Sequence, residues 1–195
     1  MIHASTSDAL KQEFILEYTC DFDITLEENL TSFLRMEIEQ GPKGINIHLD
    51  TYIKETIEEY QKYVKTALKP KKVPMQPGVI LDSHDCPEVP DPLEQKIFRS
   101  ITAKLQFGST WVRCDTAFTT SQLARFCASA GRSHWAALHH LMGYLSANPS
   151  FMLHFRAGGS SGLDGYGHRD HLPPQPMTNM GFLEKPGVRG QHGVH

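Results

Sequence analysis

The stretch SFLRMEIEQGPKGINIHL, residues 32–49, decides the fold that this sequence predicts. Apolar Leu34, Met36 and Ile38 alternate with charged side chains, and the alternation resumes at Ile45 after the turn residues GPKG (41–44). A period of two is typical of a half-buried strand, so we expect a β-hairpin with one apolar face. Because a two-stranded hairpin is marginally stable by itself, that face needs a packing partner.

Helical spacing of apolar residues predicts the partner. A helix follows the hairpin directly, capped by Asp50 or Thr51, and three short helices come later, capped by Asp91, Asp115 and Ser133. Asn148-Pro149 ends the last of them. The side chains expected on the buried faces are Ile53, Ile57, Tyr60 and Val64; Leu93, Ile97, Ile101 and Leu105; Phe118, Leu123, Phe126 and Cys127; and Trp135, Leu138, Leu141, Met142 and Leu145.

Two segments lack such spacing. Residues 69–92 contain six prolines, which predicts an extended connector, and the chain beyond Arg156 is rich in Gly, Pro and His, which predicts disorder. The fold class is therefore α+β: one β-hairpin plus a helix, then a small bundle of about three helices, with a disordered C-terminal tail. The expected divisions are an N-terminal segment without an assigned role (1–20), hairpin and helix (21–68), connector (69–90), bundle (91–156) and tail (157–195).

Composition narrows the class of protein. The length of 195 residues suits one domain and a small second one. No apolar run approaches about 18 residues, and the N-terminus lacks a secretory pattern, so we expect an intracellular protein, cytoplasmic or nuclear and not secreted, without a membrane partner. The four cysteines have no CxxC spacing, which favours reduced, mostly buried thiols over disulfides or a zinc site.

Charge is distributed unevenly along the chain. Residues 1–60 carry 4 Lys and Arg against 13 Asp and Glu, whereas residues 61–156 carry 12 against 6. A polyanion would be attracted to the second part and repelled by the first, although solvated helix faces would give the same imbalance.

Three histidines stand out in RSHWAALHHLMGYLSANPS, residues 132–150. A helix turns by about 100° per residue, so His134, His139 and His140 point in different directions and cannot share one metal ion. We therefore expect no metal site here. Two interpretations remain open: the histidines replace basic residues on a helix that faces nucleic acid, or they are simply solvated at the surface.

Several blocks in order resemble the C-terminal part of the reverse transcriptase in the Pol polyprotein of Ty1/copia-type LTR retrotransposons. The resemblance runs from about Asp21 to about Asp170. That family typically reads FLGIEIEQ, a KYI helix, TPM, YRSLVGSLMYL, TRPDIAFAVSQLARF and HW.A.KR.LRYL. The corresponding residues are Phe33 to Gln40, Tyr52 to Lys54, Val73 to Met75, Phe98 to Phe107, Val112 to Phe126, and His134 to Leu145. Arg35 replaces the family's glycine, Cys114 its proline, and His139 and His140 its Lys and Arg.

The resemblance implies the end of a polymerase palm, thumb-like helices and the approach to an RNase H strand. In the parent RNA-directed DNA polymerase such helices grip the template–primer duplex through its phosphates. The residues expected to do so here, as nucleic-acid-binding candidates, are Lys69, Lys71, Lys72, Arg99, Lys104, Arg113 and Arg125. Arg113 and Arg125 also suit a purely structural role beside a helix cap or on an amphipathic face.

The residues that catalysis needs are not recognisable in the sequence. Strand synthesis uses paired carboxylates that hold two metal ions, Mg²⁺ in the parent enzyme, and no Asp-Asp pair occurs here. Asp21-Phe22-Asp23 is expected to be a solvated acidic stretch. In the segment resembling the RNase H strand, His168 stands at the metal-ligand position, and the only carboxylates after it in the sequence are Asp170 and Glu184. We expect no catalytic residue, no metal site and no cofactor in this chain.

The expected function is therefore that of a truncated, inactive fragment that at most grips a template–primer. A polymerase subunit acting in trans with a palm-bearing chain, a non-catalytic interaction module, and a relic without function are the alternatives. The exposed hairpin face of Leu34, Met36 and Ile38 motivates the first of these.

Overall fold

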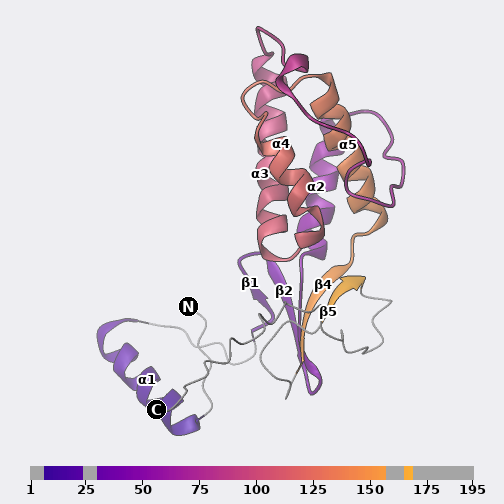
Figure 1. Cartoon of the computed structure of the whole chain (residues 1–195). Helices are drawn as coiled ribbons and strands as arrows, with labels where there is room; N and C mark the ends of the chain where they lie inside the picture. Colours follow the sequence, from indigo (N-terminus) through magenta and orange to yellow (C-terminus); the bar gives the residue numbers. More distant parts are fainter. Residues whose placement is uncertain (1–6, 24–29, 157–164, 169–195) are drawn as a thin grey trace, which may run out of the picture. The chain divides into compact units, whose positions relative to one another are not determined.

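The computed structural model describes residues 7–23, 30–156 and 165–168 (Figure 1). The chain divides into two compact units, Met1–Leu30 and Thr31–His195. The first unit contains helix α1 (Asp8–Asp21), which has no buried residue. The elements of the second unit are β1 (Ser32–Phe33), β2 (Met36–Gly41), β3 (Gly44–His48), α2 (Asp50–Tyr63), η1 (Ser83–Asp85), α3 (Pro92–Trp111), η2 (Cys114–Thr116), α4 (Ala117–Ala124), α5 (Arg132–Ala147), β4 (Phe151–Arg156) and β5 (Gly165–His168).

The predicted hairpin is formed by β2 and β3. The strands pair antiparallel with Ile38 opposite Ile47, and Gly41 opposite Gly44 leaves a two-residue loop. Gly44 has a φ of +143°, and a Cβ there would collide with the backbone carbonyl of Phe155. The turn therefore requires glycine at this position.

A second two-residue turn joins β1 to β2. Leu34 (φ +49°) and Arg35 (φ +69°) are both in the left-handed region, as the two central residues of a type I′ hairpin turn are. The expected strand position of Leu34 is wrong, and its side chain is 53% exposed. Arg35, which stands where the resembled family has glycine, is thus at a position that favours glycine.

The α+β class is confirmed, and the sheet is larger than the hairpin. Five antiparallel strands follow one another in chain order, since β4 pairs with β3 and β5 pairs with β4. β4 was predicted as the end of the bundle segment, without strand structure. β5 lies inside the expected disordered tail, whose remaining residues lie outside the described part of the chain.

Helices α2, α3, α4 and α5 stand together at one end of the sheet (Figure 1). One continuous core joins them to the hairpin, because Met36 and Leu49 belong to the same buried cluster as Phe98 and Leu138. The hairpin, the following helix and the bundle, which were expected to form separate segments, therefore share a single core. This core supplies the packing partner that the hairpin needs.

Most of the predicted buried positions are buried or packed against the core, and two are wrong. Leu93 is 65% exposed at the start of α3, and Phe118 is 68% exposed at the start of α4. The expectation that the cysteines are mostly buried is wrong. Cys20 and Cys114 are exposed, and Cys86 and Cys127 are half-buried.

Helix caps show where local reasoning succeeds. Asp91 accepts hydrogen bonds from the backbone N–H groups of Leu93 and Glu94 at 2.8 and 2.9 Å, as predicted. The other predicted caps are wrong: α2, α4 and α5 begin after Leu49, Thr116 and Gly131, and none of these three residues makes a side-chain capping hydrogen bond. α5 ends at Ala147, before Asn148-Pro149, as expected. No helix of the described segments is long and apolar enough to cross a membrane.

Candidate nucleic-acid interface

The proline-rich connector lies along helix α5 and runs opposite to it in chain direction (Figure 1). Near its start, the Lys71 N–H donates to the carbonyl of Gly143 at 3.3 Å. Near its end, the Asp85 carboxylate accepts from the Ser133 N–H in the first turn of α5. This hydrogen bond holds the pKa of the Asp85 carboxyl below its ordinary value. Between these points Leu81 is 3% exposed and belongs to the core.

Two of the three helix histidines fasten this connector. His134 is fully buried; its Nδ1 accepts from the Gly131 N–H at 2.9 Å, and its Nε2 donates to the Asp82 carbonyl at 3.0 Å. The Nε2 of His140 donates to the Val73 carbonyl at 3.0 Å. The prediction that the histidines do not converge is confirmed by these separate partners. His134 and His140 are structural residues, which sequence reasoning missed.

His139 has a different partner. Its Nδ1 lies 3.1 Å from the hydroxyl of Tyr60, a residue of α2 that is 1% exposed. Burial, and then the positive charge of Lys71, lower the pKa of His139 below its ordinary value. Burial also raises the pKa of Tyr60 to about 12, so this phenol keeps its proton at neutral pH.

The connector and the end of α2 form a basic segment, defined here as residues 62–72. It carries five lysines, Lys62, Lys65, Lys69, Lys71 and Lys72, of which Lys71 is half-buried and the others are exposed. No Asp or Glu occurs in residues 61–81, nor in residues 116–163, which include all of α5. No described carboxylate forms an ion pair with any of the five lysines. Lysines that are not paired with a carboxylate attract phosphate.

The predicted contact residues thus separate into three groups. Lys69, Lys71 and Lys72 lie together in the basic segment. This segment also contains Lys62 and Lys65, which were not among the predicted contact residues. Arg99 and Arg125 are exposed at a second place, where Arg99 reaches the carbonyl of Cys127 at 3.5 Å and Arg125 donates to the side chain of Gln122 at 2.9 Å.

Lys104 and Arg113 are engaged elsewhere. The ammonium of Lys104 is paired with Glu59 on α2. The guanidinium of Arg113 is only 1% exposed and bonds both carboxylate oxygens of Asp115, at 3.0 and 2.8 Å, as well as the Asn148 carbonyl at 2.8 Å. A phosphate at the surface cannot reach Arg113. Arg113 is therefore a structural residue and not a phosphate contact.

Arg113 also explains the failed cap at Asp115. Besides Arg113, the Asp115 carboxylate accepts from the hydroxyl of Tyr144 at 2.8 Å, so it points into α5 and not at the N-terminus of α4. Burial, followed by the negative charge of Asp115, raises the pKa of Tyr144 to about 12. This network ties η2 to the last turn of α5.

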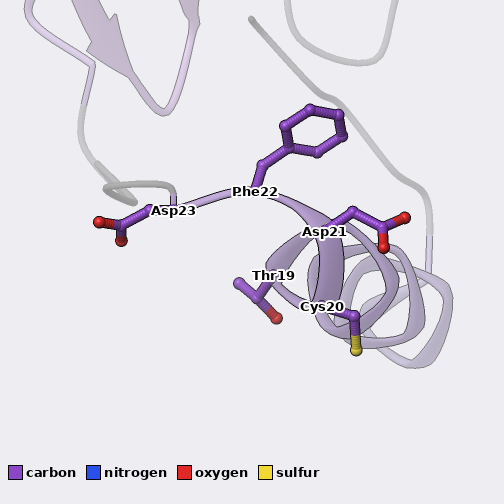
Figure 2. Close-up of a pocket in the computed structure, with 5 residues that line it drawn as sticks. All are labelled: Thr19, Cys20, Asp21, Phe22 and Asp23. Carbon is purple, nitrogen blue, oxygen red and sulfur yellow. The ribbon is translucent and has the colours of Figure 1, made fainter.

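The acidic stretch of the first unit is open to solvent. Figure 2 shows a shallow hollow lined by Thr19, Cys20, Asp21, Phe22 and Asp23 at the end of α1. The carboxylates of Asp21 and Asp23 point away from each other in this view, and both residues are exposed. Asp21 is the last residue of helix α1.

A cluster of three carboxylates surrounds buried His48. Glu37, Glu39 and Asp50 each place an oxygen 3.4 to 3.7 Å from one of its ring nitrogens. Within the described residues, no group of three or more His, Cys, Asp or Glu side chains has the geometry of a metal site. His168 lies in β5, and Asp170 and Glu184 fall outside the described residues.

Comparisons with protein families, with curated proteins and with solved structures found no match to this chain.

Proposed function

We propose that this chain holds the phosphate backbone of nucleic acid on the surface formed by the basic segment and α5, without reading its sequence. In this proposal it corresponds to the C-terminal, thumb-side part of a copia-type reverse transcriptase and grips a template–primer without catalysing strand synthesis. The order of the sequence blocks supports the family, and the basic surface supports the binding.

The observation that carries the proposal is the fixed, uncompensated charge of the basic segment. Hydrogen bonds to α5 hold the backbone at Lys71 and Val73, so the lysines project from an ordered connector. Lysine ammonium groups bind phosphates as point charges, and each neutralised phosphate releases counterions. The affinity should therefore fall steeply as salt rises and should change little with base sequence.

A filter-binding titration with a duplex of random sequence tests this function. The account predicts binding at low salt that weakens linearly on a logarithmic plot against salt concentration. Equal affinity for duplexes of unrelated sequence is the second expected result. Absence of binding at 20 mM salt (about the lowest practical ionic strength, where screening is weak) would remove the proposal.

The exposed end of the sheet favours one alternative, a polymerase subunit acting in trans. Met36 of the predicted hairpin face is buried in the core, but Ile45 and Phe155, which pair across β3 and β4, are 40% and 39% exposed. A palm-bearing chain could cover them. Co-purification with such a chain, abolished by Ile45→Glu, would support this alternative, and a monomer that captures none would exclude it.

A further inference from the structure

The hydroxyl of Tyr60 fixes how His139 presents its ring. The buried Tyr60 hydroxyl lies 3.1 Å from His139 Nδ1, and either group can be the donor in this hydrogen bond. The hydroxyl is assigned as the donor because its hydrogen has no other acceptor among the described residues. If Nδ1 carried the hydrogen instead, the buried hydroxyl would lose its acceptor, at a cost of about 1–3 kcal/mol. The neutral imidazole therefore carries its hydrogen on Nε2. Among the described residues, that Nε2 has no hydrogen-bond partner.

Lys71 lies on the same face of α5 as His139. The γ-carbon of Lys71 would be 3.2 Å from a Cβ at Gly143, so the lysine stem crosses the helix at this glycine. Gly143 is four residues after His139, about one helical turn, and residues at this spacing share a face. The charge of Lys71 is close enough to lower the pKa of His139. Glycine at position 143 also admits the Lys69 carbonyl, with which a Cβ would collide.

The remaining charged groups around this point are cationic or turned away. His140 gives its Nε2 to Val73, and α5 contains no carboxylate. On α2, Glu59 is paired with Lys104, and Glu58 is about 200° around the helix from Tyr60. The Lys71 stem and the His139 ring thus share one face of α5, and no described carboxylate forms an ion pair with Lys71.

We propose that Lys71 and His139 together bind one phosphate group of a nucleic-acid backbone, with the Lys71 Nζ supplying charge and the His139 Nε2–H donating a hydrogen bond. This inference rests on the proposed function and names its central contact. Tyr60 is a positioning residue that fixes the imidazole tautomer. The neutral imidazole acts as a donor, so the contact does not require an acidic medium.

Binding of a short oligodeoxythymidylate and of inorganic phosphate tests the inference. Lys71→Met keeps the stem over Gly143 and removes one charge, and His139→Phe keeps a ring beside Tyr60 and removes the donor. At 50 mM salt, Lys71→Met should weaken oligonucleotide binding about tenfold, and His139→Phe about threefold. In the Lys71→Met background, His139→Phe should weaken oligonucleotide binding by less than about twofold, because both residues bind the same phosphate.

The control is Lys96→Met, which removes one exposed charge from α3. Nitrogen NMR of the histidine rings in the wild-type chain gives an independent readout that needs no variant. The oligonucleotide should shift the His139 Nε2 signal and leave buried His134 unchanged, and inorganic phosphate should do the same only at millimolar concentration.

The outcomes separate this inference from the function beneath it. Two results would overturn the subsite and leave the proposed function standing. In the first, binding depends on salt but the His139 signal does not shift. In the second, Lys71→Met weakens oligonucleotide binding no more than Lys96→Met does. A response to inorganic phosphate without one to the oligonucleotide would also overturn it. Absence of all binding would overturn both.

Discussion

Replacement of Arg113 by Met tests whether this residue serves the fold or the surface. The guanidinium is 1% exposed and its partner Asp115 is 12% exposed, so the ion pair is almost wholly removed from water. Removal of one partner of a buried pair costs about 3–5 kcal/mol, because the other charge stays buried without compensation. Here the loss includes the bond to the Asn148 carbonyl and the stacking of the guanidinium on Phe151, 4.8 Å from the ring centre.

Urea unfolding followed by circular dichroism measures this loss. Domains of this size are stable by about 5–15 kcal/mol, so Arg113→Met should still fold and show a much lower midpoint. Asp115→Asn retains an acceptor for Tyr144, and the double variant should cost about 2 kcal/mol less than the sum of the single variants. Lys96→Met should stay within about 0.5 kcal/mol of the wild type. A loss below about 1 kcal/mol for Arg113→Met would refute the reasoning.

Three further predictions concern the turn, the connector and His139. Leu34→Asn with Arg35→Gly should raise the unfolding free energy by about 1 kcal/mol, because it places the preferred pair in a turn with two positive φ angles; an unchanged or lower urea midpoint would count against the turn. Gly131→Ala should cost about 1–3 kcal/mol, because its Cβ would collide with the Asp85 carbonyl, and a thermal midpoint equal to that of the wild type would contradict that contact. His139 has a lowered pKa in the folded chain, so the unfolded chain binds more protons below about pH 6.5 and stability falls there. Urea midpoints between pH 7.5 and 5 should therefore fall more for the wild type than for His139→Phe; parallel curves would argue against a perturbed His139.

Local patterns predicted the elements that local physics determines. The alternation around Met36 and Ile38 and the glycines at 41 and 44 were enough to identify the β2–β3 hairpin. Asp91, followed by proline and Glu94, was enough to identify a capped helix, because its acceptor and its donors are within three residues of one another.

Long-range contacts account for what the sequence could not show. β4 pairs with β3 across more than a hundred residues, and the bond between His154 and Asn46 spans 108 positions. Short strands carry little signal until a partner is known. Asp115 resembled a cap, but a buried arginine and Tyr144 compete for its carboxylate. The structural role of His134 and His140 depends on hydrogen bonds to the connector. The connector has no periodicity that would predict its position along α5.

The candidate interface was only partly predictable, because the sequence shows its charges but not their tertiary partners. The charge of Lys69, Lys71 and Lys72 is visible in the sequence, and so is the acid-free run that adds Lys62 and Lys65. Whether a basic residue is available to a phosphate depends on its tertiary partners. Lys104 is paired with Glu59, and Arg113 is buried.

The salt dependence of duplex binding tests the central claim most directly. If all five lysines of the basic segment contact phosphates, the slope of log K against log salt is about −4.5, since each contact contributes about −0.9. The triple variant Lys69→Met, Lys71→Met, Lys72→Met should lose about 2.7 of that slope, while Lys104→Met should leave it unchanged. A triple variant with the slope of the wild type would contradict the account, because the phosphates would then be held elsewhere.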